Sequence, residues 1–329
     1  MAVPDRPGGA AEVLGAAAIP TLPRTDGVVA AGVRRRFGDI EAVRDIHLTA
    51  EPGRVTALIG PNGAGKTTLL LILATLLKPD AGLVRIAGFD PVSEPLQVRA
   101  RMGWTPDVFG LYENLTVAEY LGFVGAAYRL PRPRTAARAS ELLQLTRLEE
   151  FRDRPVHVLS RGQKQRLGLC RALMHDPAVL LLDEPAAGLD PRSRVELREL
   201  LRRLAGEGKA VLVSSHVLAD LEEVADKAVF LDRGATVGEH EVDALPASTG
   251  TRAWRLRSLD TPALLAALDR NGYARDEPTP AGVDVRLASE EDAVALIAGL
   301  VHDGVPVVSC APVGGALEAT FLELTGRPA

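Results

Sequence analysis

Residues 60–68 constrain this chain most, because they contain the glycine-rich pattern G-x-x-x-x-G-K-[ST]. In such a loop the backbone N–H groups wrap the phosphates of a nucleotide. The apolar residues 55–59 predict a buried strand before the loop, and the apolar run 68–77 predicts a helix after it. The helix N-terminus then faces the phosphates. This order favours a nucleoside triphosphate site over a glycine-rich turn before a core helix, with binding residues Gly60, Pro61, Asn62, Gly63, Ala64, Gly65, Lys66, Thr67 and Thr68.

A second segment carries two neighbouring acids. Residues 179–184 read Val-Leu-Leu-Leu-Asp-Glu, which is typical of a buried parallel strand that delivers carboxylates at its C-terminal end. In a triphosphatase Asp183 would hold Mg²⁺ through water, and Glu184 would polarise the attacking water. The alternative is a strand that ends in two solvated acids. Together with the loop, the segment favours hydrolysis as well as binding of the nucleotide.

The spacing of these two segments indicates an inserted subdomain. More than a hundred residues separate Lys66 from Asp183, far more than a simple βαβ crossover requires. Within this interval residues 159–166 read Leu-Ser-Arg-Gly-Gln-Lys-Gln-Arg, which resembles the LSGGQ signature of the ATP-binding subunits of ABC transporters. Arg161 departs from the family's glycine. Ser160, Gly162 and Gln163 match, and the resemblance implies that the Ser160 hydroxyl and the Gly162 N–H contact the γ-phosphate.

The resemblance extends over residues 28–239 and includes further landmarks of the family. Phe37 looks like the aromatic residue that stacks on adenine, although a single aromatic also fits an ordinary strand end. Residues 187–190 read Ala-Gly-Leu-Asp and resemble the family's D-loop, in which Asp190 would couple two nucleotide sites. His216 follows the strand expected at 211–215 and resembles the switch histidine that contacts the γ-phosphate, whereas a lone histidine at a strand end is usually structural.

Asp107 is the clearest departure from the family pattern. The family has a glutamine here that ligates Mg²⁺ and begins the stretch that touches the membrane subunit, whereas this chain reads Trp-Thr-Pro-Asp at residues 104–107. A carboxylate can also bind a hard cation through oxygen. It adds a negative charge, however, and cannot donate a hydrogen bond when ionised. The alternative is a loop acid without a metal role.

Composition agrees with a globular nucleotide-binding protein. The chain has 329 residues, 47% of them hydrophobic and 25% charged, which is enough for two domains with a large core. A net charge of −5 argues against a nucleic-acid partner, whose phosphates are usually met by a basic face. Two cysteines do not make a disulfide scaffold or a metal cluster. No apolar run is long enough to span a bilayer, so we expect any pore to belong to another chain.

The fold class expected from these observations is α/β, a P-loop NTPase core of ABC type with a β-rich N-terminal part. We expect a disordered tail at 1–27, an ATP-binding domain at 28–243 with a helical insert at about 107–158, and a small α+β domain at 244–329. The periodicity predicts helices at 117–128, 135–145 and 317–326, a helix capped by Thr261, and strands at 253–257, 283–287 and 305–309. The last of these helices resembles the C-terminus of the daunorubicin-resistance exporter ATPases.

The resemblance implies an ATP-hydrolysing subunit of an exporter at the cytoplasmic face of the membrane, driving a separate membrane permease. Two copies, or one copy and a related ATPase, would meet head to tail and enclose each ATP between 60–68 of one chain and 160–163 of the other. Lys66 would hold the β- and γ-phosphates, and Thr67 would ligate Mg²⁺ with Asp183. Three alternatives stay open: an importer ATPase, a soluble ABC ATPase that acts on ribosomes or DNA, and a nucleotide-gated regulator without turnover.

Overall fold

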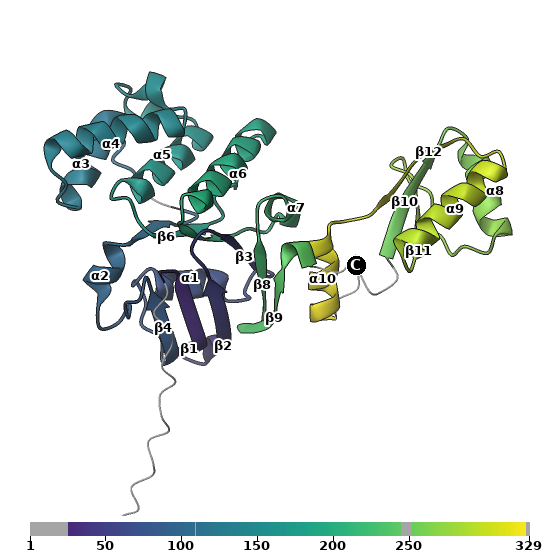
Figure 1. Ribbon diagram of the computed structural model, residues 1–329, viewed down its shortest axis with the longest axis horizontal. Coiled ribbons are helices and arrows are strands. Elements are labelled where there is room, and N and C mark those ends of the chain that lie inside the picture. Colours follow the sequence, from purple (N-terminus) through teal and green to yellow (C-terminus); the bar gives the residue numbers. More distant parts are fainter. Residues whose placement is uncertain (1–25, 109, 245–251, 327–329) are drawn as a thin grey trace, which may run out of the picture.

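A nine-stranded sheet forms the centre of the molecule (Figure 1). The computed structural model describes residues 26–108, 110–244 and 252–326, so nearly all of the tail expected at 1–27 lies outside the described residues. The strand order is β4-β1-β2-β9-β8-β3-β7-β6-β5. The strands are β1 (Val28–Phe37), β2 (Ile40–Ala50), β3 (Val55–Ile59), β4 (Ala81–Ile86), β5 (Met102–Thr105), β6 (Val179–Asp183), β7 (Ala210–Ser214), β8 (Lys227–Asp232) and β9 (Ala235–Glu241).

Half of this sheet is parallel and buried on both faces. β3, β5, β6, β7 and β8 pair in parallel, whereas β1 pairs antiparallel with β2 and β4. Every residue of β6 is buried, and its alternate side chains enter two different cores: Leu180 and Leu182 on one face, Leu181 on the other. A strand covered on both faces must be apolar throughout, which is why its two acids come only at its end.

Helices cover the two faces and form the insert. The helix after the glycine-rich loop, α1, spans Lys66–Leu73 and is shorter than the expected run 68–77. It ends because Thr75 is left-handed (φ 63°) and the next N–H groups bond back to Leu71. The remaining helices of this part are α2 (Pro95–Arg99), α3 (Val117–Ala127), α4 (Arg132–Leu145), α5 (Arg161–Leu173), α6 (Pro191–Gly206) and α7 (Leu218–Glu222), with single turns at Glu149–Phe151, Val156–Val158 and Val242–Ala244.

The first two helices of the insert, α3 and α4, begin at or near the residues that the sequence predicted. α3 begins at the capping box of Thr116 and Glu119, in which each side chain accepts from the other residue's backbone N–H. α4 begins three residues earlier than expected. Pro131 occupies its N-cap position, where the carbonyl oxygen accepts from the Thr135 N–H at 2.9 Å, and Pro133 lies in the first turn, where a missing N–H costs no helical hydrogen bond. α3, α4 and α5 lie together at one end of the molecule (Figure 1).

A small second sheet lies beyond the main one, with order β11-β10-β12. Its elements are β10 (Arg252–Ser258), α8 (Thr261–Arg270), β11 (Val283–Leu287), α9 (Glu290–His302) and β12 (Val307–Pro312). These elements share their own apolar core, which includes Trp254, Leu264 and Leu296. α8 is capped by Asp260 rather than by the expected Thr261, since the Asp260 carboxylate accepts from the Ala263 N–H.

The last helix differs from the expected domain plan. α10 (Ala316–Thr325) does not join the small sheet: Leu317 is fully buried in the core of the main sheet, and Phe321 and Leu324 pack against that core. Figure 1 shows α10 beside β8 and β9, away from α8 and α9. An apolar stripe on a helix shows that one face is buried but not against which surface. Residues 244–329 are therefore not one separate body, because the chain returns to the main domain at its end.

Candidate nucleotide site

The glycine-rich loop joins β3 to α1 and takes a shape that requires glycine. Gly63 and Gly65 have positive φ angles of 83° and 97°. A Cβ atom at Gly65 would lie 2.7 Å from the Ala42 carbonyl oxygen, and one at Gly60 would lie 2.5 Å from that of Leu231. A side chain at either position would force the neighbouring strand away. The backbone of the loop can therefore adopt its curve only with these residue types.

Lys66 places a buried cation inside the loop. The residue is 8% exposed, and its Nζ donates to the carbonyl oxygens of Gly60 (2.6 Å) and Pro61 (3.2 Å). Burial lowers the pKa of the Lys66 ammonium, and the negative charges of Glu184 and Asp183 act in the opposite direction. The ammonium is thus held by neutral carbonyl dipoles, and a phosphate that enters the loop meets a cation with little water around it.

The two acids lie at the C-terminal end of β6, opposite the loop. Asp183 is 3% exposed and accepts from the Ser214 hydroxyl at 2.6 Å. Glu184 has a positive φ of 50°, and its N–H donates to the backbone oxygen of Ser214 (3.2 Å) and to its hydroxyl (3.1 Å). Ser214 therefore orients both acids at once. The sequence analysis did not identify Ser214 as a site residue. The signal was that the strand expected at 211–215 ends in polar residues, at the same edge of the sheet as the two acids.

His216 meets Glu184 directly. The His216 Nδ1 lies 2.7 Å from the Glu184 Oε2, and the His216 backbone N–H donates to the same oxygen at 3.3 Å. The histidine side chain is 63% exposed and the glutamate side chain 17%. The two residues follow neighbouring parallel strands, β6 and β7, whose carboxyl ends meet at one edge. The structure thus brings together two residues that the sequence separates by 32 positions.

These groups line one cavity of about 760 Å³. Its lining contains most of the predicted phosphate and metal residues, namely Pro61, Asn62, Gly63, Gly65, Lys66, Thr67, Thr68, Asp107, Asp183, Glu184 and His216. Gly60 and Ala64 complete the loop behind them. Sequence analysis did not single out two arginines that also line the cavity, Arg44 and Arg233, because isolated charges on a strand and a hairpin carry no recognisable pattern.

The oxygen donors of this cavity fit a magnesium ion. The Thr67 hydroxyl and the Asp107 and Asp183 carboxylates face the same space, and Mg²⁺ is usually bound by one or two carboxylates together with water and phosphate oxygens. One oxygen of Asp183 is engaged by Ser214, which leaves the other for a ligand. Within the described residues no cluster of three or more His, Cys, Asp or Glu side chains forms a complete metal cage. The donor set therefore suits a partly hydrated ion carried by a nucleotide.

The remaining predicted residues lie outside that cavity. Phe37 is 43% exposed at the end of β1, where the Arg35 guanidinium lies 4.7 Å from its ring centre. Ser160 caps α5: its hydroxyl accepts from the Gln163 N–H at 3.3 Å, and the Gln163 side chain accepts from the Ser160 N–H at 2.8 Å. Gly162 follows within the first turn of α5 and Asp190 caps α6, so both belong to helix N-termini.

Arg161 departs from the expected signature, and its guanidinium has a definite place. A Cβ atom at Gly188, in the D-loop, would lie 2.7 Å from the Arg161 Nε. The arginine also lines the cavity together with Asp183 and Glu184. Gly188 has a positive φ of 73°, a backbone conformation that favours glycine, and the absence of a side chain there leaves room for the Arg161 guanidinium. The glycine-rich loop after β3, the paired acids after β6, two strands away in the parallel sheet, and the Lys66 ammonium in the loop define a P-loop nucleoside triphosphatase.

Comparison with known proteins narrows this class. Residues 43–187 match the ABC transporter family. The chain is 37% identical over 216 residues to the ABC transporter ATP-binding protein NatA of Bacillus subtilis, covering 64% of this chain and 88% of that protein. It is 33% identical over 312 residues to the daunorubicin/doxorubicin resistance ATP-binding protein DrrA of Streptomyces peucetius, covering 93% and 94%. The chain belongs to the ATP-binding proteins of the ABC transporter family, and it is an ATPase.

Solved structures of ABC ATP-binding proteins superpose on this chain. An ATP-binding subunit of an ABC transporter superposes with a TM-score of 0.62 at 29% identity, covering 66% of this chain and 91% of that one. A dimeric cassette in a post-hydrolysis state, bound to ADP and phosphate, superposes with a TM-score of 0.60 at 28% identity, covering 65% and 98%. These comparisons confirm the ABC-type α/β fold. Among the described residues no helix is long and apolar enough to cross a membrane.

Proposed function

We propose that this chain powers an ABC exporter by hydrolysing ATP at the cytoplasmic face of the membrane, where it binds a separate permease. The observation that carries the proposal is the match to DrrA over 93% of the chain, which includes the residues after the nucleotide domain. Relatives named for drug resistance favour export over import and over a role on ribosomes or DNA. A net charge of −5 also disfavours a nucleic-acid partner.

The geometry supports a site completed by a second copy. Lys66, Glu184 and His216 line the cavity, whereas Ser160 and Gly162 lie at the N-terminus of α5 and do not line it. A helix N-terminus with free N–H groups is a phosphate-binding element. In a head-to-tail dimer, residues 160–163 of one chain would meet residues 60–68 of the other, and the solved dimeric cassette shows that such proteins pair. Each copy supplies one half of the site, so one chain alone binds ATP but does not enclose it.

Catalysis follows from the positions of the acids and the lysine. Thr67 and Asp183 would hold Mg²⁺, with Asp107 as a further oxygen ligand, and the ion would neutralise charge on the β- and γ-phosphates. Glu184 would accept the proton of the attacking water. His216 holds the Glu184 carboxylate in place at 2.7 Å. Lys66 would bind the β- and γ-phosphates from inside the loop, and Phe37 would stack on the adenine ring.

The surface beyond Asp107 suits the membrane partner. A groove of about 1080 Å³ lies between the insert and the main sheet, lined by Trp104, Tyr112, Tyr120, Phe123 and Tyr128 among others. Tyr112 is 58% exposed and Phe123 49%, and their rings meet edge to face with centres 5.0 Å apart. Exposed aromatic side chains that gather in one groove are typical of a protein-binding surface. We assign this groove to a short apolar segment of the permease.

Replacement of Glu184 by glutamine tests the proposed function. The amide fits the space of the carboxylate but cannot take the proton of water, so Glu184→Gln should bind ATP and release almost no phosphate. Because the nucleotide is not consumed, the ATP-bound dimer should accumulate. Size-exclusion chromatography with and without ATP, alongside phosphate release, measures both effects. Near wild-type hydrolysis by the variant would show that Glu184 does not accept the proton of the attacking water. A variant that stays monomeric with ATP would count against the shared site.

A further inference from the structure

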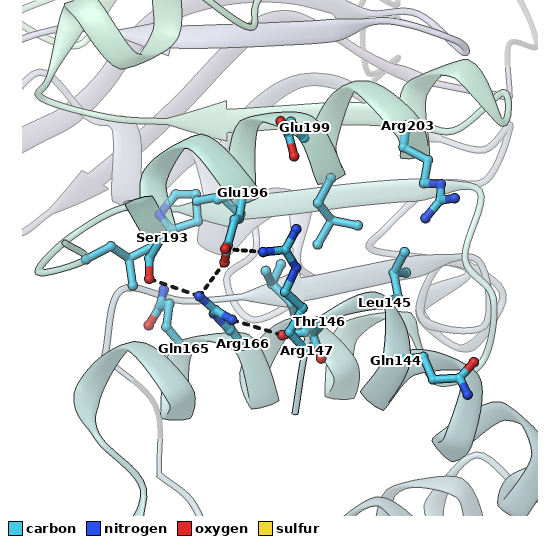
Figure 2. A pocket seen from close by; sticks show the side chains of 15 residues that line it. Gln144, Leu145, Thr146, Arg147, Gln165, Arg166, Ser193, Glu196, Glu199 and Arg203 are labelled. Atoms are coloured by element: carbon cyan, nitrogen blue, oxygen red, sulfur yellow. Dashed lines mark hydrogen bonds and ion pairs between the residues drawn. The ribbon is translucent and has the colours of Figure 1, made fainter. Parts of the chain in front are cut away.

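One arginine connects three elements beside a cavity of about 360 Å³ (Figure 2). Arg166 lies on α5, and its guanidinium donates to the backbone oxygen of Thr146 at 3.3 Å, at the end of α4. It also donates to the Ser193 hydroxyl at 2.9 Å and to the Glu196 carboxylate at 2.6 Å, both on α6. The Arg166 side chain is only 22% exposed. A planar guanidinium carries its donors on separate nitrogens in a fixed fork, so it can hold acceptors on two helices at once, whereas the three donors of a lysine all lie on one nitrogen.

The Ser193 hydroxyl connects Arg166 to Asp190, the last residue of the D-loop. Ser193 is 8% exposed; it accepts from Arg166, so its own proton is free for Asp190, whose Oδ2 lies 2.7 Å away. The Ser193 N–H donates to the other Asp190 oxygen at 3.0 Å. These two bonds from Ser193 lower the pKa of the Asp190 carboxyl. A chain of hydrogen bonds therefore runs from the insert through the signature helix to the residue that caps α6.

Three arginines pair with Glu196, and they differ in how far their side chains are exposed. Glu196 also pairs with Arg147 and with Arg192, at 3.3 Å for the latter. Arg147 and Arg192 are exposed (57% and 84%), and neither hydrogen-bonds to Ser193. Exposed ion pairs contribute little to stability. Arg166 is the member of the cluster that reaches the D-loop, through Ser193.

We propose that Arg166 and Ser193 are positioning residues that hold the signature end of α5 and the D-loop end of α6 in one fixed relation. Ser160 caps the first helix and Asp190 caps the second. The proposal rests on the shared site described above, in which both caps must reach the nucleotide of the second copy together. A small misplacement of groups in such a site reduces the rate about a hundredfold, whereas it leaves nucleotide binding to the glycine-rich loop unchanged.

The test uses the full-length chain with two changes in the contact and three control variants. Ser193→Ala removes the hydroxyl, and Arg166→Lys keeps the charge but loses the fork of donors. Ser193→Thr restores the hydroxyl, and the adjoining cavity, which Ser193 lines, has room for the added methyl group. Arg147→Gln and Arg192→Gln remove charges that also pair with Glu196 but do not touch Ser193.

Four quantities distinguish positioning from a structural role: kcat, the Hill coefficient for ATP, ATP affinity measured without metal, and the melting temperature. We expect Ser193→Ala and Arg166→Lys to lower kcat at least about tenfold and to bring the Hill coefficient toward one, with ATP affinity within about twofold of wild type. Ser193→Thr, Arg147→Gln and Arg192→Gln should resemble wild type. The variant that combines Ser193→Ala with Arg166→Lys should lose no more kcat than the worse of the two single variants, because both changes break the same chain of hydrogen bonds.

Three results would overturn the proposal. These are wild-type kcat and Hill coefficient in Ser193→Ala, an equal loss in the two exposed-arginine controls, and a loss of kcat in Ser193→Ala that matches its loss of ATP affinity. Failure of the proposed function would look different, because the unaltered chain itself would then neither hydrolyse ATP nor pair in its presence. If Arg166→Lys does not fold, Ser193→Ala and Ser193→Thr alone decide the question.

Discussion

At the scale of single residues, the site combines groups that any P-loop ATPase needs with one acid that the resemblance does not explain. Asp107 lines the nucleotide cavity together with Thr67 and Asp183, so its carboxylate shares their space. Lys66 and His216, by contrast, each have a partner that fixes them.

Two changes at Asp107 distinguish a metal ligand from a loop acid. Asp107→Ala should raise the Mg²⁺ concentration needed for half-maximal hydrolysis, because an oxygen ligand is lost. Asp107→Gln should hydrolyse at least as fast as wild type, because the amide offers an oxygen without a second full charge near the triphosphate. ATP affinity without metal should barely move. A Mg²⁺ titration of steady-state hydrolysis decides it, and identical curves for all three proteins would reject the ligand role.

His175 predicts how stability depends on pH. Burial lowers the pKa of His175 from 6.5 to about 4, with Tyr128 stacked on its ring at 3.8 Å. Between these pH values the unfolded chain binds the proton and the folded chain does not. The free energy of unfolding therefore falls as the pH drops through this window, by at most about 1.4 kcal/mol per pH unit, and is unaffected above it.

The variant His175→Phe keeps an aromatic ring against Tyr128 and removes the titrating group. Its free energy of unfolding should fall less than that of wild type when the pH is lowered from above 6.5 toward about 5. Urea denaturation at both pH values measures the difference, and subtraction of the two proteins cancels the carboxylates that titrate in the same range. Equal slopes would show that His175 is not responsible.

At the scale of helices and strands, the sequence predicted most of what forms the site. Residues 55–59 and 179–183 are strands as expected, because an apolar run bounded by a glycine or by acids has few other solutions. The pairing of His216 with Glu184 could not be derived, since it depends on which strands are neighbours. The capping role of Ser160 and Gln163 was also missed, although S-x-x-Q is a capping-box pattern.

Helix α10 belongs to the main core, which gives a prediction at this scale. Leu317 is fully buried there, whereas Val308 on β12 is 50% exposed. Truncation of a buried leucine costs about 2–5 kcal/mol through lost burial and a new cavity, and truncation of an exposed valine costs little. Leu317→Ala should therefore lower the urea midpoint of the main domain, and Val308→Ala should not.

The fluorescence of two tryptophans distinguishes urea unfolding of the main domain from unfolding of the small sheet. Trp104 lies on β5 of the main sheet, and Trp254 lies on β10 of the small one. With Trp254→Phe the fluorescence reports the main domain, and with Trp104→Phe it reports the small sheet. If Leu317→Ala shifted only the transition seen by Trp254, the assignment of α10 to the main core would be wrong.

At the scale of the whole molecule, the return of α10 changes what a minimal ATP-binding unit must contain. Ending the chain near residue 246 removes the small sheet and α10 together. Leu221, Val224 and Phe230 lie in the core that Leu317 enters, so this truncation uncovers apolar side chains of the main domain. Such a chain should lose stability or solubility, for a reason unrelated to the nucleotide site.

A chain that keeps α10 should behave otherwise. We expect that replacing residues 247–314 with a flexible linker of about 12 Gly and Ser residues leaves α10 on the main core, because such a linker spans about 20 Å. This protein should bind ATP with wild-type affinity and melt near the full-length chain, while the chain ending at 246 melts several degrees lower. Scanning calorimetry and equilibrium ATP binding on the three proteins compare them. If both shortened chains matched the full-length protein, α10 would contribute nothing to the main domain; if both failed to fold, the small sheet would be an integral part of that domain.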